Sequence, residues 1–133
     1  MVCLGAWGCD FSSVVSQSPA PAPIRIHLFS GGECPLAGLP RQLTFRIDVA
    51  AADQVVAIDE TATTYRVWWP DGFRGGTAED PVVRDRRGLV VARDAEVLVT
   101  PAKGFPNLHG HSVCSGGDQD RAAIWVQFQT ITP

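Results

Sequence analysis

The chain has 133 residues, of which 45% are hydrophobic and 19% charged, and its formal net charge is −3 at pH 7. This length suits a single domain with its own core, and the composition excludes a disordered chain. Acidic residues outnumber basic ones, 14 to 11, so the surface repels a phosphate backbone and we expect no nucleic acid partner. No apolar run approaches the ~20 residues that cross a bilayer as a helix.

The first 23 residues are expected to lie outside the folded domain. Ala6-Trp7-Gly8-Cys9 resembles in part the lipobox of bacterial lipoproteins, in which the cysteine receives the lipid. Trp7 is bulky for that motif, and no Lys or Arg precedes Cys9. One explanation is that the natural signal begins upstream of Met1.

The stretch 11–23, FSSVVSQSPAPAP, is predicted to be a spacer. Its alternating prolines favour an extended, semi-rigid chain, which is the form needed between a lipid-bearing Cys9 and a folded domain. We therefore divide the chain into a partial signal and tether, 1–23, and a single domain, 24–133. The alternative is a disordered N-terminus with an ordinary Cys9.

From Ile24 onward, apolar and polar residues alternate, which predicts half-buried β-strands. The predicted strands are 24–29, 41–49, 63–69, 95–100 and 124–131, with a hairpin over 82–94. One face is shared by Ile24, Ile26 and Leu28, another by Leu43, Phe45, Ile47 and Val49, and a third by Tyr65, Val67 and Trp69. Pro70 is expected to end its strand because it lacks an N–H, and Gly88 to close the hairpin turn.

Seven or eight such strands, with turn signals between them and no convincing amphipathic helix, predict an all-β fold. We expect a small antiparallel β-barrel of the OB-like kind, with a β-sandwich as the alternative. An immunoglobulin sandwich fits poorly, because Trp68 lies far beyond Cys34. In addition, Ser112 rather than a tyrosine stands two residues before Cys114.

The run VVRDRRGLVVARDAEVL, with WWPDGF ahead of it, resembles a hairpin pattern of small secreted or lipid-anchored domains from high-GC bacteria. Their pattern reads Asp-x-x-Gly-x-Val-Val-Ala-x-x-Gly-Asp, and the match covers Trp68–Leu98. Ala95-Glu96 replaces the final Gly-Asp, so the turn there departs from the pattern. The resemblance implies a β fold outside the cytosol, and it implies no activity.

Cys34 and Cys114 are predicted to form a disulfide. If Cys9 is lipidated and Cys3 is removed with the signal, they are the even pair left in an oxidising compartment. Both are expected in glycine-rich loops, SGGECPLAG and SVCSGGD. They close a loop so long that chain entropy gives about 4–5 kcal/mol of stabilisation. In a reducing cytosol both would be free thiols.

The segment NLHGHSVC is the candidate metal site. In an extended segment His109 and His111 point the same way, and Cys114 or His27 could complete a site for Zn²⁺ or copper. The alternative is a polar loop with two solvated imidazoles. A disulfide at Cys114 and a metal ligand at Cys114 exclude each other.

The segment YRVWWPDGF is the candidate ligand surface. Trp68 and Trp69 are adjacent in a strand, so one indole fills the core while the other faces solvent. An exposed indole beside Asp71 and Arg74, with the loop 73–81, could stack on a sugar ring of a cell-wall glycan or anchor a protein partner. The alternative is that the second indole covers the open end of the barrel.

Catalytic chemistry has little support in the sequence. Asp80 and Asp85, with the nearby Arg84, Arg86 and Arg87, are expected to form a solvated hairpin tip. No Gly-x-Ser-x-Gly elbow occurs, and the paired glycines lack the strand–loop–helix context of a phosphate site. We therefore predict no catalytic residue.

Together these features predict a non-enzymatic, extracytoplasmic domain of the bacterial cell envelope. It would be tethered to the membrane by a lipid on Cys9 and would bind an envelope protein or a cell-wall glycan without a cofactor. The alternative is a small zinc- or copper-binding protein that uses His109 and His111. An enzyme of unfamiliar mechanism is the third possibility.

Overall fold

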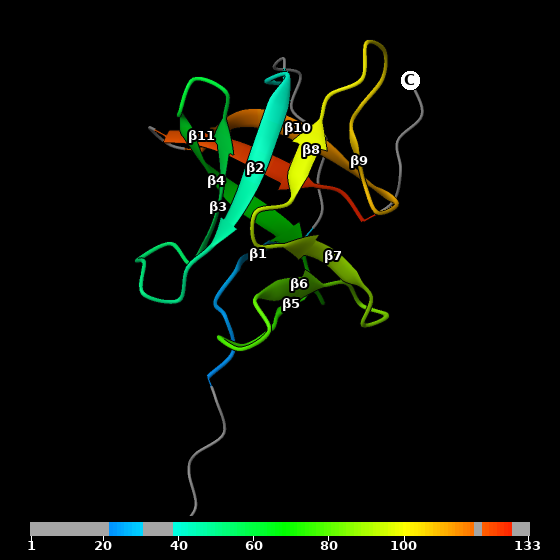
Figure 1. Cartoon of the computed structure of the whole chain (residues 1–133). Coiled ribbons are helices and arrows are strands. Elements are labelled where there is room, and N and C mark those ends of the chain that lie inside the picture. Colours follow the sequence, from blue (N-terminus) through cyan, green and yellow to red (C-terminus); the bar gives the residue numbers. More distant parts are fainter. Residues whose placement is uncertain (1–21, 31–38, 119–120, 129–133) are drawn as a thin grey trace, which may run out of the picture.

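The computed structural model describes residues 22–30, 39–118 and 121–128, which consist of β-strands and their connections (Figure 1). The strands are β1 (His27–Phe29), β2 (Gln42–Ile47), β3 (Val55–Asp59), β4 (Thr64–Pro70), β5 (Arg74–Gly75), β6 (Val82–Arg84), β7 (Val90–Arg93), β8 (Val97–Val99), β9 (Asn107–Leu108), β10 (His111–Asp118) and β11 (Arg121–Val126). The predicted all-β fold is confirmed. Within these ranges no helix has the length and hydropathy of a membrane span.

Eight strands form one nearly closed, barrel-shaped sheet in the order β8-β2-β3-β4-β11-β10-β9, with β1 also paired to β4. Strands β5, β6 and β7 form a separate antiparallel sheet beneath it (Figure 1). The expected barrel is therefore present, but its pairing is mixed, because β1 and β11 both run parallel to β4. Strand β1 pairs with the end of β4, beyond the residues that pair with β3.

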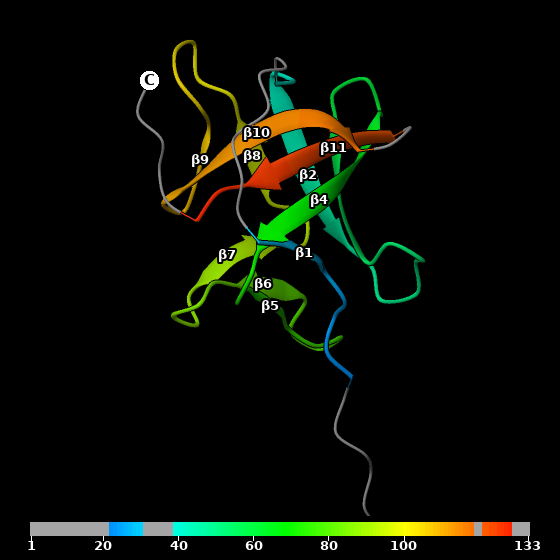
Figure 2. The ribbon, with the colours of Figure 1, turned by 180° about the vertical axis from the view of Figure 1, so that it is seen from behind.

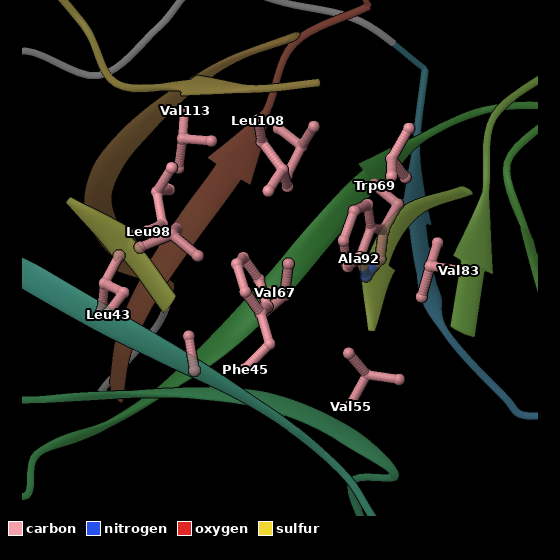
Figure 3. Close-up of a cluster of buried hydrophobic side chains, with 14 of the residues drawn as sticks. Leu43, Phe45, Val55, Val67, Trp69, Val83, Ala92, Leu98, Leu108 and Val113 are labelled. Atoms are coloured by element: carbon pink, nitrogen blue, oxygen red, sulfur yellow. The ribbon is translucent and has the colours of Figure 1, made fainter. Parts of the chain in front are cut away.

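The core fills the space between the inner face of the barrel sheet and the small sheet. Phe45, Val67 and Trp69 are completely buried at its centre. Figure 3 shows leucine and valine side chains from β2, β8, β9 and β10 pointing toward one another, with Val83 and Ala92 of the small sheet beside Trp69. Each fully buried side chain of this size contributes about 1.5–3 kcal/mol to stability.

The alternation expected in β2 and β4 is confirmed as far as those strands extend. Leu43, Phe45 and Ile47 are buried, whereas Val49 is 44% exposed because β2 ends at Ile47 and a turn follows. Strand β4 ends at Pro70 as expected. In the first predicted strand the expectation was partly wrong. Ile24 is buried, but Leu28 is 44% exposed in β1, which is only three residues long.

The hairpin of β6 and β7 closes through Gly88, which has a φ of 85°, as predicted. The next turn contains Ala95, whose φ of 69° also lies in the left-handed region. A residue with a Cβ is disfavoured there by roughly 1–2 kcal/mol. In the bacterial hairpin pattern that position is a glycine, so the departure in sequence coincides with a strained backbone.

Strand β10 is the largest error of the sequence prediction, which placed Cys114 in a loop. Cys114 lies in β10, where it is opposite Trp125 of β11, just after the residues that pair with β9. The residues from His111 to Ser115 are all buried, so this strand lacks the alternation that identifies a half-buried strand. Strand β3 was also not predicted.

Candidate functional site

Four aromatic rings form a row on the outer face of the barrel sheet. Trp68 and Trp125 are stacked, with ring centroids 5.2 Å apart and planes 9° apart. His27 lies 5.4 Å from Trp68, and the edge of Phe29 meets Trp125 at 5.2 Å. All four side chains are half-buried. We call His27, Phe29, Trp68 and Trp125 the aromatic ladder.

The ladder follows from strand register. His27 of β1 is opposite Trp68 of β4, and Trp68 is opposite Trp125 of β11, in two parallel pairings. Directly opposed residues place their side chains on the same face of a sheet, so the rings stand side by side. Figure 2 shows β1, β4 and β11 in succession on this side of the molecule. Because Val67 and Trp69 point into the core, Trp68 points outward.

A charged cluster adjoins the ladder, and Asp53 is its centre. The Asp53 carboxylate accepts a hydrogen bond from His27 Nε2 at 3.0 Å and another from Arg121 Nη1 at 2.9 Å. Arg66 Nη2 lies 3.8 Å from the same carboxylate. The Arg121 side chain is 52% exposed, so part of its guanidinium faces solvent. We call Asp53, Arg66 and Arg121 the charged cluster, which His27 joins to the ladder.

Hydrogen bonding and charge keep Asp53 ionised. The hydrogen bond from His27 lowers the pKa of the Asp53 carboxyl below its usual 3.8, although partial burial opposes this effect. Arg66 and Arg121 lower the pKa further by their positive charges. The cluster therefore combines one carboxylate with two guanidinium groups on the outer face of β4 and β11.

The predicted ligand surface of Trp68, Trp69, Asp71 and Arg74 is not one surface. Trp69 is completely buried and packs against Phe45 and Phe73, so its inclusion was wrong. Asp71 and Arg74 are exposed, but they belong to the turn after β4 and to the small sheet. The expectation that the two indoles face opposite sides is confirmed, and the structure groups Trp68 with the aromatic ladder instead.

His109 and His111 do not lie together in one extended segment, so that assumption was wrong. His109 and Gly110 both have positive φ, 51° and 94°, and form the two-residue turn between β9 and β10. His109 Nε2 contacts Glu96 Oε2 at 2.6 Å on the surface. In the described ranges, no group of three or more His, Cys, Asp or Glu side chains is placed to hold a metal ion.

His111 is buried and connects the barrel to the small sheet. Its Nδ1 donates a hydrogen bond to the Gln127 carbonyl at 3.1 Å, and its Nε2 lies 3.5 Å from Asp85 Oδ2. The ring also meets Phe73 edge-on at a centroid distance of 5.1 Å. These contacts give His111 a structural role at the contact between the two sheets.

Asp85 was expected at a solvated hairpin tip, and this expectation was wrong because its side chain is almost completely buried. Its carboxylate accepts hydrogen bonds from the backbone N–H groups of Arg87 and Leu89, which shapes the turn. Burial raises the pKa of Asp85, but these bonds and those from the Arg87 and His111 side chains outweigh it, so the pKa lies below 3.8. Its neighbours Arg84 and Arg87 are exposed as expected, with side chains 39% and 70% accessible.

Of the three cysteines in the predictions, the structure describes only Cys114. Cys114 is buried and is not a free thiol. Cys9 and Cys34 lie outside the described residues, so the lipid site and the pairing of Cys34 with Cys114 stay predictions. Cys114 is opposite Trp125 in the register of β10 and β11, which places it next to the aromatic ladder.

Sequence reasoning missed Trp125, His27, Asp53 and Arg121 as members of the site. The sequence did contain a partial signal. Trp125 alternates with the buried Ile124 and Val126 as Trp68 does with its neighbours, so each strand has one outward indole. Nothing in the sequence indicated that the two indoles meet, because parallel pairing brings together strands that are far apart in the chain.

No protein-family model matches the chain, and no curated protein or solved structure is significantly similar to it. The functional interpretation therefore depends on the geometry of the described residues.

Proposed function

We propose that the chain is a non-enzymatic binding domain of the bacterial cell envelope, held outside the cytosol by a lipid on Cys9. The aromatic ladder and the charged cluster form its binding face. The supporting observation is that four aromatic rings and an exposed arginine are continuous on the outer face of β1, β4 and β11, outside the hydrophobic core.

The composition of this face favours a protein partner. Trp and Arg are the residues that most often contribute the binding energy of protein interfaces. Arg121 uses one Nη1 contact with Asp53 and has further N–H donors directed to solvent. A partner that places a carboxylate there would form charge-assisted hydrogen bonds.

The stacking geometry argues against the glycan alternative. A sugar ring binds by covering an open aromatic face. Trp68 is flanked by Trp125 and His27, and the edge of Phe29 meets Trp125, so these ring faces already contact one another. We therefore propose an envelope protein with an acidic patch as the partner, and a glycan becomes an outcome of the test.

Site-specific crosslinking in cells tests the binding face. A photo-reactive amino acid at position 121 should crosslink to one envelope protein. The same amino acid at position 93 is the matched control, because Arg93 is an exposed arginine of β7 in the small sheet. Equal crosslinking at both positions, or crosslinking at 121 to glycan alone, would contradict the proposal.

The location has its own test. Expression with the upstream codons in the presence of a radioactive fatty acid should label the protein, and Cys9→Ala should remove the label. Oxidised protein should give a peptide mass that joins Cys34 to Cys114. A protein without label would contradict the lipid anchor. A Cys34 thiol that reacts with an alkylating reagent would contradict the disulfide.

A further inference from the structure

A groove lies at one end of the barrel sheet and has a volume of about 590 Å³. The described residues that line it come from the start of β2, the turn after β3 and the end of β8. Figure 1 shows the start of β2 beside the end of β8 at the upper end of the barrel. Small-molecule sites have volumes of roughly 300–1,000 Å³, so this groove has room for a small ligand.

Strand register places the floor of the groove on the outer face of the sheet. Gln42 is opposite Val99 in the pairing of β2 with β8. Their neighbours Leu43 and Leu98 are buried, so Gln42 and Val99 point outward. On the other side of β2, the Gln42 N–H donates a hydrogen bond to Glu60 Oε1 at 3.2 Å. Glu60, Gln42 and Val99 therefore form a row across three neighbouring segments.

The backbone that carries Arg41 is fixed beside this row. The Thr100 N–H donates a hydrogen bond to the Arg41 carbonyl at 2.9 Å, and the Thr100 hydroxyl donates another to the Pro40 carbonyl. Leu39, which also lines the groove, packs against the hydrophobic core. The groove is thus built on the barrel sheet and its core.

Arg41 and Glu60 bring opposite charges into the groove. Both side chains are exposed, and none of the ion pairs among the described residues includes either of them. The Glu60 carboxylate accepts the bond from Gln42 and can accept several more. The Arg41 guanidinium has five N–H donors and makes no hydrogen bond within the part of the chain that the structure describes. The groove therefore offers one partner for an anion and one for a cation.

The same groove has an apolar wall. Val99 is 64% exposed, the largest exposure among the big hydrophobic side chains of the described ranges. Leu39 and Pro101 also line the groove. Covering these side chains with an apolar group removes their surface from water, which is favourable. A ligand that fits the groove thus combines two opposite charges with an apolar part.

We propose that this groove binds a small dipolar molecule that carries a carboxylate, an ammonium group and an apolar side chain, such as a dipeptide. Arg41 would hold the carboxylate, Glu60 would hold the ammonium group, and Val99 would contact the apolar side chain. Exposed ion pairs are weak, so the dissociation constant should be about millimolar. The aromatic ladder belongs to β1, β4 and β11, so the groove is a second site, separate from the proposed binding face.

Titration with related dipeptides tests the class of ligand. The probe is alanyl-valine, added to the ¹⁵N-labelled protein while the amide resonances are followed. The resonances of Gln42, Val99 and Thr100 should shift and reach saturation. Alanyl-valinamide lacks the carboxylate and acetyl-alanyl-valine lacks the ammonium group, so each should bind about three- to tenfold more weakly. Absence of a saturable shift, equal binding of all these peptides, or shifts confined to β4 and β11 would overturn the proposal.

Two charge variants assign the contacts. Arg41→Gln should bind alanyl-valine no better than alanyl-valinamide, because the carboxylate has lost its partner. Glu60→Gln keeps an acceptor for the Gln42 N–H and should bind alanyl-valine no better than its acetylated form. Arg93→Gln is the matched control, an exposed arginine of the small sheet, and should bind like the unaltered protein.

The variants also decide against the proposal if they keep both preferences of the unaltered protein. Arg41 and Glu60 are exposed, so the resonances outside the groove should stay in place and show that each variant is folded. If a variant does not fold, the amidated and acetylated peptides make the same test on the unaltered protein.

Discussion

The indole of Trp68 lies stacked on the indole of Trp125, although β4 and β11 are far apart in the chain. The pair joins the neighbouring strands β4 and β11 on the outer face of the barrel, while Val67 and Trp69 of β4 belong to the core inside. It is therefore both part of the proposed binding face and a contribution to stability.

Trp68→Ala should destabilise the fold while leaving it intact. A fully buried aromatic side chain costs about 3–5 kcal/mol when cut to alanine, and Trp68 is half-buried, so we expect a loss of about 2 kcal/mol. Urea unfolding measures the loss, and the circular dichroism signal of coupled indoles should disappear. Trp68→Phe is the control, since it keeps a ring between His27 and Trp125. A change below about 0.5 kcal/mol would show that the stack is absent in solution.

Ala95→Gly should stabilise the protein. Ala95 has a φ of 69°, which glycine adopts without the steric cost of a Cβ. Part of that gain is offset by the greater freedom of glycine in the unfolded chain, so we expect about 0.5–1 kcal/mol. Thermal unfolding measures it. Ala102→Gly, in an exposed loop without a positive φ, should not stabilise the protein, and equal effects of the two substitutions would contradict the explanation.

Asp85→Asn should be strongly destabilising for a hairpin residue. The amide keeps one acceptor for the turn but places an uncharged group beside His111 and Arg87, and we expect a loss of about 2 kcal/mol. The matched control is Asp80→Asn, because Asp80 is 54% exposed and its ion pair with Arg84 is worth no more than about 0.5 kcal/mol. The urea midpoints of unfolding of the two variants are compared with that of the unaltered protein. Similar midpoints for the two variants would mean that Asp85 is solvated.

Acid should destabilise the protein through Asp53 and Asp85. The pKa of each carboxyl is lower in the folded protein than its usual 3.8, so the unfolded chain takes up protons first as the pH falls. Their stabilisation is complete above about pH 4 and is lost as the pH drops through the folded values. Urea midpoints at pH 5 and pH 3 measure this loss. Asp53→Asn should show a smaller drop between those pH values, and an unchanged drop would remove Asp53 from the explanation.

The parts of the fold that were predictable are those where one face of a strand meets water. Leu43, Phe45 and Ile47 alternate with polar residues, and the opposite directions of Trp68 and Trp69 follow from the same period of two. Strand β10 was not predictable by that rule because both of its faces are covered. Its glycines also favoured a loop.

The candidate site was less predictable than the fold, because it depends on which strands are neighbours. Alternation places Trp125 on an outer face but does not say that β11 pairs in parallel with β4. Asp53 comes from the loop between β2 and β3, and its bonds to His27 and Arg121 join three distant segments. Asp85 looked like one member of a solvated run of charges, and its buried carboxylate instead meets the backbone N–H groups of its own turn and the ring of His111.

Binding of the purified domain to isolated cell envelopes tests the central claim most directly. The unaltered protein should bind saturably, Arg121→Glu should bind at least about tenfold more weakly, and Arg93→Glu, an equal charge reversal on the small sheet, should bind like the unaltered protein. Equal affinities for the two reversed variants, or no saturable binding at all, would contradict a binding face on β1, β4 and β11.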